Sequence, residues 1–393
     1  NISPRNGATN QALTSRIGIA FSDLIDVESL DSLSIRVQTS AGVAVPGTFS
    51  AQLGMVNFSP ASTLVANTTY EVIVAAGGVR DYAGNGVAAE WRSSFTTENQ
   101  STVSGNTAYW PLDDNTRDHA GSNDLIQNGA SFSEGGIYLN GSQRLTSEQA
   151  LNNSLGGTAS MSFYIKTNQT GGDKGWNSPG IAGADQSWWW NDVFWGWMDN
   201  AGRIHVSTAN EWGAASQPIN DNQWHHVVLT RNKDSGQLKV YVDGNRQATG
   251  TGVTGHFGTY FNSIGHIHGT SNYLRAGLDD IKVYNRVLND TDVSNIFNQV
   301  KISLAPELTQ QAELVNGTIA FDVASSRGGN LQYSWNFGDG NESTYSPDAL
   351  AYHSYSQPGH YQVILRVKNG DQISTHNFVK TVHAPLTINK PVA

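Results

Sequence analysis

The sequence QWHHVVLTR at residues 223–231 is followed closely by LKVYVDG at residues 238–244. Both stretches are rich in β-branched and aromatic residues and alternate in character, as expected for strands whose successive side chains point to opposite faces. Between them, DSG at residues 234–236 provides the glycine that a tight connection favours. These residues therefore predict an antiparallel β-hairpin.

Similar short alternating runs recur along the rest of the chain, with Gly, Pro and Asn between them. Near the start, Ile17, Ile19 and Phe21 alternate in this way. Long helical periodicities are rare, so the pattern predicts an all-β protein. A chain of 393 residues is too long for one hydrophobic core, and we therefore expect two or three domains.

Composition excludes several classes of partner. The net charge is -10 and Lys and Arg are not clustered, so we expect no nucleic-acid binding. No run of 18 apolar residues occurs, so we expect no membrane insertion. The absence of cysteine fits a bacterial extracellular protein whose domains are large enough to fold without disulfides, but it fits a cytosolic protein too. Neither chain end resembles a natural terminus, so we expect the chain to be part of a larger polypeptide.

Residues 107–300 form the central predicted unit. Besides the hairpin, it contains YWPLD at residues 109–113, DHAGSN at 118–123 and GLDDIKVYNRVL at 277–288. These motifs, in this order, resemble the laminin-G-like, concanavalin A-like jelly-roll family over most of the unit. The resemblance implies two curved antiparallel sheets, in many members a bound calcium ion, and a family that includes many sugar-binding modules.

Residues 1–98 form the first predicted unit. The sequences LVANTTY at residues 64–70, DYAGN at 81–85 and SSFTT at 93–97 resemble those of bacterial Ig-like β-sandwich domains. The resemblance covers nearly the whole unit and implies a spacer.

Residues 303–384 form the last predicted unit. They contain YSWNFGDG at residues 333–340, HSY at 353–355 and GHYQVILRV at 359–367. This pattern resembles the PKD domain, an Ig-like β-sandwich that serves mostly as a spacer or weak binder in bacterial secreted proteins. The predicted fold is therefore an Ig-like sandwich, a jelly roll and a PKD sandwich in series.

The jelly-roll resemblance also implies a calcium site. The acids in its two calcium-associated stretches are Asp113, Asp114, Asp118, Asp279 and Asp280. Calcium prefers six to eight oxygen ligands. If the two stretches meet at one sheet edge, the repulsion between Asp118 and Asp279 would require a cation. We therefore expect one structural calcium ion bound by these two side chains. The alternative is that Asp279 caps a turn and Asp118 is solvated.

Tryptophan is concentrated in the central unit. Three consecutive tryptophans, at residues 188–190, cannot all lie on one buried sheet face, because neighbouring side chains alternate. Exposed aromatic patches mark binding surfaces, and indole rings can stack on sugar rings. The predicted ligand-binding residues are Trp176, Trp188, Trp189, Trp190, Trp212, Asn191 and Asp192.

Two alternatives remain open for this cluster. Trp195 and Trp197 either pack inside the jelly roll or join the ligand site, and all the tryptophans could instead be core residues. Asn210, Glu211 and Arg203 are further candidates for hydrogen bonds to sugar hydroxyls. Iodide quenching of tryptophan fluorescence would separate an exposed platform from a buried cluster.

The sequence offers no catalytic signature. It lacks the Glu-x-Asp-x-(x)-Glu pattern of jelly-roll hydrolases, a Gly-x-Ser-x-Gly elbow and a His-Glu-x-x-His helix. We therefore predict a non-catalytic carbohydrate-binding and spacer segment of a secreted or cell-surface bacterial protein, with a polysaccharide or glycan as its partner. The alternative is an adhesive or architectural stalk of a surface protein that recognises protein or host glycan.

Overall fold

The computed structural model describes residues 1–13, 15–52, 54–61, 64–98, 105–113, 115–133, 135–186, 191–209, 212–299, 313–323, 326–369 and 372–384. It is about 48% strand and 5% helix, which confirms the predicted all-β class. The chain forms two compact units. One contains residues 1–101 and 299–393, and the other contains residues 102–298.

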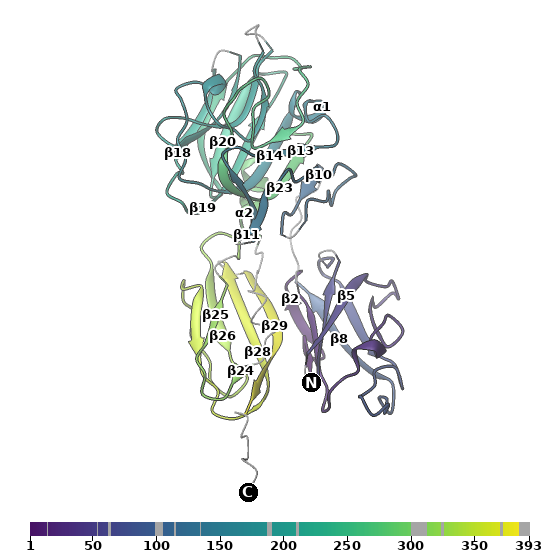
Figure 1. The fold of residues 1–393 in the computed structure, drawn as a ribbon. Coiled ribbons are helices and arrows are strands. Elements are labelled where there is room, and N and C mark those ends of the chain that lie inside the picture. The colour runs from purple at the N-terminus through teal and green to yellow at the C-terminus, as the bar shows by residue number, and fades with distance from the viewer. Residues whose placement is uncertain are drawn as a thin grey trace, which may run out of the picture. The chain divides into compact units, whose positions relative to one another are not determined.

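The second unit is a jelly roll of two facing sheets (Figure 1). Its larger sheet has, in spatial order, β11 (Ser131–Ser133), β12 (Gly136–Asn140), β23 (Arg275–Tyr284), β14 (Ala159–Lys166), β19 (Trp224–Arg231), β20 (Gln237–Val242) and β21 (Asn245–Thr251). Strand β9 (Asn106–Trp110) also pairs with β23. The predicted hairpin is β19 and β20, paired antiparallel with Val227 opposite Val242.

The facing sheet contains β15 (Ala182–Ala184), β16 (Val193–Met198), β17 (Arg203–Thr208) and β18 (Trp212–Pro218), in that order. Trp195 and Val206 of this sheet and Phe163, Val227 and Leu278 of the larger sheet belong to one buried apolar cluster. A third, smaller sheet is formed by β10 (Leu125–Ile126), β13 (Leu145–Ser147) and β22 (Ser263–Ile264).

Short helices complete the jelly roll. Helix α2 (Asp290–Phe297) places Val293 and Ile296 against Val228, on the side of the larger sheet away from the main core. The Asn289 side chain accepts a hydrogen bond from the Asp292 backbone N–H, and the Asp292 carboxylate accepts one from Asn289, so α2 begins with a capping box. The other helical turns are α1 (Asn152–Leu155) and the 3-10 helix η2 (Gly175–Asn177).

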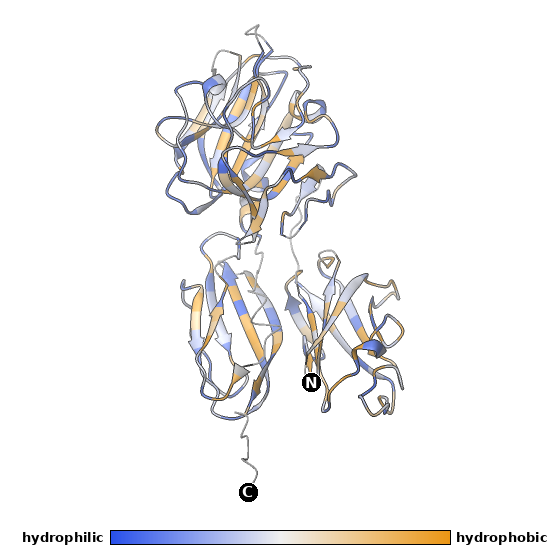
Figure 2. Ribbon diagram, viewed as in Figure 1, coloured by the Kyte–Doolittle hydropathy of each residue, from blue (hydrophilic) through white to orange (hydrophobic). Residues whose placement is uncertain are grey.

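The first unit contains two β-sandwiches. In the N-terminal one, a sheet of β1 (Ile2–Ser3), β3 (Ile17–Ala20), β6 (Met55–Pro60) and β5 (Gly47–Gln52) packs on β2 (Ala8–Gln11), β8 (Trp91–Thr97), β7 (Thr69–Val74) and β4 (Ile35–Thr39). Figure 2 shows apolar residues interspersed with polar ones in the strands of this sandwich. The alternation predicted for Ile17 and Ile19 places both in the core.

The C-terminal sandwich contains β24 (Glu313–Leu314), β25 (Ile319–Asp322), β26 (Gln332–Asn336), β27 (Leu350–His353), β28 (Gly359–Asn369) and β29 (Gln372–His383). Phe321 packs on Trp335 and Phe337 at its centre, with ring centroids 5.2 and 5.1 Å apart. Within this unit, β2 lies between β8 and β29, so one sheet runs through both sandwiches. In the described part of the chain, we find no helix with the length and apolarity needed to span a membrane.

Candidate ligand-binding surface

A β-bulge in β16 decides which tryptophans face the core. Trp195 lies opposite Val206, whereas Trp197 lies opposite His205, so Gly196 is an extra residue in the strand. Trp195 therefore packs in the main core, and Trp197 lies with Phe194 and Ile267 in a separate apolar cluster. We call the side of the β15–β18 sheet that carries Phe194 and Trp197 the outer face.

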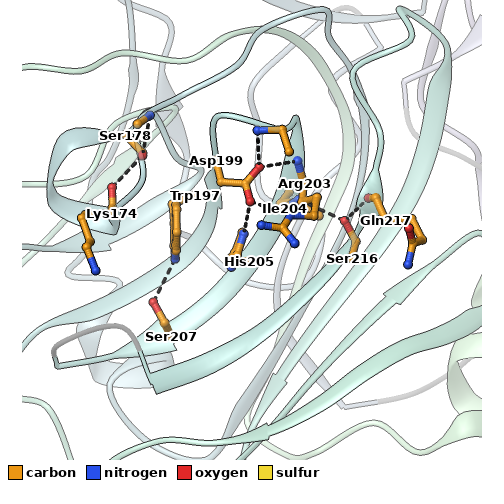
Figure 3. Close-up of polar contacts among 12 residues, drawn as sticks. Lys174, Ser178, Trp197, Asp199, Arg203, Ile204, His205, Ser207, Ser216 and Gln217 are labelled. Carbon is orange, nitrogen blue, oxygen red and sulfur yellow. Dashed lines mark hydrogen bonds and ion pairs between the residues drawn. The ribbon is translucent and has the colours of Figure 1, made fainter.

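Trp197 supports a histidine on this outer face. Its ring stacks on the ring of His205, with centroids 3.9 Å apart and an interplanar angle of 19°. Its indole N–H donates to the hydroxyl of Ser207 at 2.9 Å (Figure 3). Trp197 is itself buried. It therefore contacts the His205 ring from the protein side and fixes the orientation of that ring.

Asp199 organises the polar end of the same face (Figure 3). Its Oδ1 accepts the backbone N–H groups of Ala201 and Arg203, and its Oδ2 accepts Nε–H of Arg203 at 2.6 Å and lies 3.0 Å from Nε2 of His205. Burial alone would raise the pKa of Asp199, but the hydrogen bonds from Arg203 and His205 outweigh it and lower the pKa. Asp199 is therefore a buried, charged carboxylate with four donors around it.

His205 and Arg203 differ in charge and exposure. Burial lowers the pKa of His205 more strongly than the neighbouring Asp199 raises it, so the ring is neutral at pH 7. The Arg203 side chain is 46% exposed, and Asp199 holds it through Nε. Because Asp199 accepts only the Nε–H, the terminal NH2 groups of this partly exposed guanidinium are further donors that a ligand could use.

A rigid loop places an exposed tryptophan on the same side of the sheet. The backbone at Gly175 lies so close to Phe194 that a Cβ there would meet the phenyl ring at 2.9 Å. The next residue, Trp176, is 54% exposed. The Ser178 hydroxyl donates to the carbonyl of Lys174 at 2.6 Å, and Asn177 Oδ1 accepts the Lys174 N–H at 3.0 Å. The loop is thus tied to itself and to the outer face, and Trp176 projects from it into solvent.

Two other predicted ligand residues, Asn191 and Asp192, differ in their exposure to solvent. Asn191 is exposed, and its carbonyl accepts the Thr259 hydroxyl at 3.4 Å. Asp192 is buried and accepts the Gln186 N–H at 2.7 Å. Burial raises the pKa of Asp192 to about 6, and the charge of Asp185 adds to the rise although the bond from Gln186 opposes it.

Several predicted residues cannot be placed. Trp188, Trp189, Trp190, Asn210, Glu211 and Asp114 lie outside the described residues, and so does the side chain of Trp212. Their proposed contacts with a ligand or a metal stay predictions.

The predicted calcium ligands are engaged with the protein itself. Oδ1 of Asp118 accepts the backbone N–H groups of Tyr109 and Ala120, and Oδ2 accepts that of Asn123. Asp279 is fully buried in β23. Among the described residues, no group of three or more His, Asp or Glu side chains is arranged to hold a metal ion. These contacts favour a structural role for Asp118, and the calcium site stays a prediction.

Comparison with known families identifies three regions of the chain in order. The sequence model of the bacterial Ig-like domain matches residues 1–97, that of the concanavalin A-like lectin/glucanases superfamily matches residues 139–294, and that of the PKD domain matches residues 305–383. Each match lies within one of the three units predicted from sequence motifs, and the concanavalin A-like match covers residues 139–294 of the predicted unit 107–300.

Individual similar proteins are distant. Human polycystin-1-like protein 1 is 27% identical over 176 residues, which are 40% of this chain and 6% of that protein. The chain thus spans a small fraction of this curated relative. A Trypanosoma rangeli sialidase has 16% identity and a TM-score of 0.41, with coverage of 54% of this chain and 33% of the sialidase. The binding domain of botulinum neurotoxin DC, solved in complex with rat synaptotagmin II, has 13% identity and a TM-score of 0.39, with coverage of 68% and 72%.

Proposed function

Because the chain consists of a bacterial Ig-like domain, a concanavalin A-like lectin/glucanase domain and a PKD domain in series, we propose that it is a non-catalytic, glycan-binding segment of an extracellular bacterial protein. The ligand surface is the outer face of the β15–β18 sheet together with the loop that carries Trp176. The single observation that supports it best is the exposed indole of Trp176, held on a self-bonded loop above Phe194.

The chemistry of this surface suits a sugar ring. An exposed indole offers a flat apolar face for the C–H groups of a pyranose. On the outer face, Arg203 is partly exposed and has terminal N–H groups besides the Nε–H that Asp199 accepts. With Nε2–H of His205 assigned as the donor to Asp199, its Nδ1 is left as an acceptor. An apolar ring, a fixed donor and a fixed acceptor on this side of the sheet are the groups that a neutral or acidic glycan requires.

Two carboxylates of this surface, Asp199 and Asp173, favour binding over hydrolysis. Glycoside hydrolases use two carboxyl groups that flank the scissile bond, one of them as an acid. Here both oxygens of Asp199 already accept hydrogen bonds, and its lowered pKa disfavours an acid role. Asp173, in the Trp176 loop, is exposed and also has a lowered pKa because Asn177 donates to it. Neither carboxyl group suits protonation of a leaving group near pH 7.

Affinity gel electrophoresis against a panel of neutral and acidic polysaccharides tests the function. We expect retardation by at least one glycan, and Trp176→Ala should weaken that affinity about tenfold, which corresponds to ~1.4 kcal/mol. Trp91→Ala is the matched control, because Trp91 is a 40% exposed tryptophan of the N-terminal sandwich. Retention of full affinity by Trp176→Ala would exclude this surface. Failure of every glycan to retard the chain would favour recognition of a protein by an adhesive stalk.

Thermal unfolding of the full chain, with and without EDTA, tests the predicted calcium ion. If Asp118 and Asp279 bind calcium, EDTA should lower the melting temperature of the jelly roll, and calcium should restore it. Asp118→Asn should then remove the response to EDTA. A melting temperature that EDTA does not change would assign Asp118 only to the backbone hydrogen bonds that it accepts.

A further inference from the structure

Strand β29 of the C-terminal sandwich is buried on both of its faces. A strand in an antiparallel sandwich commonly has one face on the core and one in solvent. In β29, Phe378 packs in the core of its own sandwich. Val379, on the opposite face, lies in an apolar cluster with Ala20 and Met55 of the N-terminal sandwich. All side chains from residue 376 to residue 382 are buried. The N-terminal sandwich therefore covers the second face.

Specific polar contacts accompany this apolar seam. The backbone N–H of Ala12 donates to the carbonyl of Thr375 at 2.9 Å, which joins β2 to β29 in a parallel ladder. Beside it, the side-chain amide of Asn377 donates to Oε1 of Gln11, and both side chains are buried. A buried amide pair is satisfied only while both partners are present, because either one alone would lose its hydrogen bond without gaining water. The seam is therefore specific as well as apolar.

Two further contacts extend the seam beyond the β2–β29 ladder. Nε2 of Gln362 donates to the carbonyl of Ile2 at 2.8 Å, and the Thr381 hydroxyl donates to the sulfur of Met55 at 3.3 Å. Strands β1, β2 and β6 of one sandwich thus meet β28 and β29 of the other. The contacts involve residues more than 300 positions apart in the sequence.

The jelly roll accounts for how such distant residues meet. The chain enters it on β9 and runs towards its end on β23, and these strands are antiparallel neighbours with Asn106 opposite Tyr284. Two segments tethered through one domain are held at a high effective concentration relative to each other. A modest seam is then enough to keep them associated.

We propose that the two terminal sandwiches form one cooperatively folded body, in which each is the docking partner of the other and the jelly roll is an insertion in the sequence between them. This inference does not depend on the glycan-binding function. It assigns the Ig-like and PKD sandwiches of this chain a mutual structural role, in contrast to independent spacers on a string.

An engineered disulfide tests the seam directly, because the natural chain contains no cysteine. Gln11 and Thr375 are register partners on adjacent strands, so their Cα atoms lie about 5 Å apart, within the range of a disulfide. We expect the full chain with Gln11→Cys and Thr375→Cys to form an intramolecular disulfide on mild oxidation, with faster migration on a non-reducing gel. The matched pair Gln11→Cys with Ile373→Cys is offset by two residues and should cross-link poorly. Absence of the disulfide, or a covalent dimer, would overturn the proposal.

Hydrogen exchange of the full chain tests cooperativity. Val379→Lys places a charge in the seam, and we expect amide exchange about tenfold faster in both β3 and β28, which belong to different sandwiches. Ile373→Lys is the matched control, because Ile373 lies on the same strand and the same face but is 40% exposed. Faster exchange in the C-terminal sandwich alone would show that the two sandwiches fold independently and would overturn the proposal.

Discussion

Asp199 shows how one buried carboxylate positions several functional groups. A charged group out of water is stable only when its lone pairs are satisfied. Two backbone N–H groups fix the position of this carboxylate, and Arg203 and His205 then bond to its second oxygen. The two side chains on the proposed ligand surface are thus oriented by a buried residue.

Removal of this carboxylate should cost both stability and affinity. Asp199→Ala leaves the backbone N–H groups of Ala201 and Arg203, whose hydrogen bonds are partly buried, without this acceptor, and each such group costs up to about 1–3 kcal/mol. We expect the free energy of unfolding of the jelly roll to fall by about 2–4 kcal/mol, measured by urea denaturation. Asp234→Ala, at an exposed pair with Lys233, should change it by less than about 0.5 kcal/mol. Equal effects of the two variants would contradict this role for Asp199.

The orientation of the site residues could be predicted from the sequence only in part. The motif at residues 223–231 predicted a strand, because its signal is local, and the structure has strand β19 there. The concentration of tryptophan drew attention to Trp176, whose side chain is exposed, and its role in ligand binding stays a prediction. Asp199 and His205 were not among the predicted site residues. Their signal was weak: an acid four residues before Arg203, in a turn between two strands. Nothing in the sequence alone states that these three side chains share one face.

At the scale of elements, the bulge at Gly196 is the feature that alternation could not predict. Strict alternation in β16 would place Trp195 and Trp197 on the same face, so the sequence predicts one location for both, either the core or the ligand site. The extra residue sends them to opposite faces. Gly196 adopts φ of 73°. A single glycine within a strand is compatible with a bulge but does not require one.

Gly196→Ala should damage both the strand and the site. Alanine in the left-handed region costs about 1–2 kcal/mol, and its Cβ would also lie 2.4 Å from Cγ1 of Ile181. We expect thermal and urea unfolding to show a loss of about 2–4 kcal/mol, together with weaker glycan binding because His205 and Trp197 would shift. Gly255→Ala is the matched control, since Gly255 also has a positive φ but has open space around the position of a Cβ. If Gly255→Ala is equally damaging, the packing against Ile181 is not important.

At the scale of the whole molecule, the three-part organisation was readable from sequence, but the association of the outer parts was not. Each unit carries its own motifs within a few dozen residues, and the family matches follow them. The pairing of Gln11 with Thr375 links strands that are far apart in the sequence and leaves no local pattern. A strand that is buried on both faces has the same apolar composition as any buried core strand, so its sequence does not show that a second sandwich covers it.

Buried histidines give both units a sensitivity to acid. His226 in the jelly roll and His376 in strand β29 of the C-terminal sandwich are fully buried, and burial lowers the pKa of each to about 3. Lys282 lowers the pKa of His226 further, while Asp243 and Asp280 oppose this, and Arg16 adds to the effect at His376. An unfolded histidine has a pKa near 6.5, so below that pH the unfolded state binds a proton that the folded state does not. Stability is therefore retained above about pH 6.5 and falls as the pH decreases towards 3.

Variants of these histidines should flatten the loss of stability in acid. Each buried histidine contributes up to about 1.4 kcal/mol per pH unit between pH 6 and pH 4, so His226→Gln and His376→Leu should each reduce the slope by about that amount in urea titrations at several pH values.

Asp192→Asn should change the pH dependence of stability with the opposite sign. The pKa of Asp192 is about 6 in the folded state and lower in the unfolded state, so its burial is unfavourable at pH 7.5 and less so in acid. Its replacement should raise stability at pH 7.5 and steepen the loss in acid. Unchanged slopes in both histidine variants would place the acid sensitivity elsewhere in the chain.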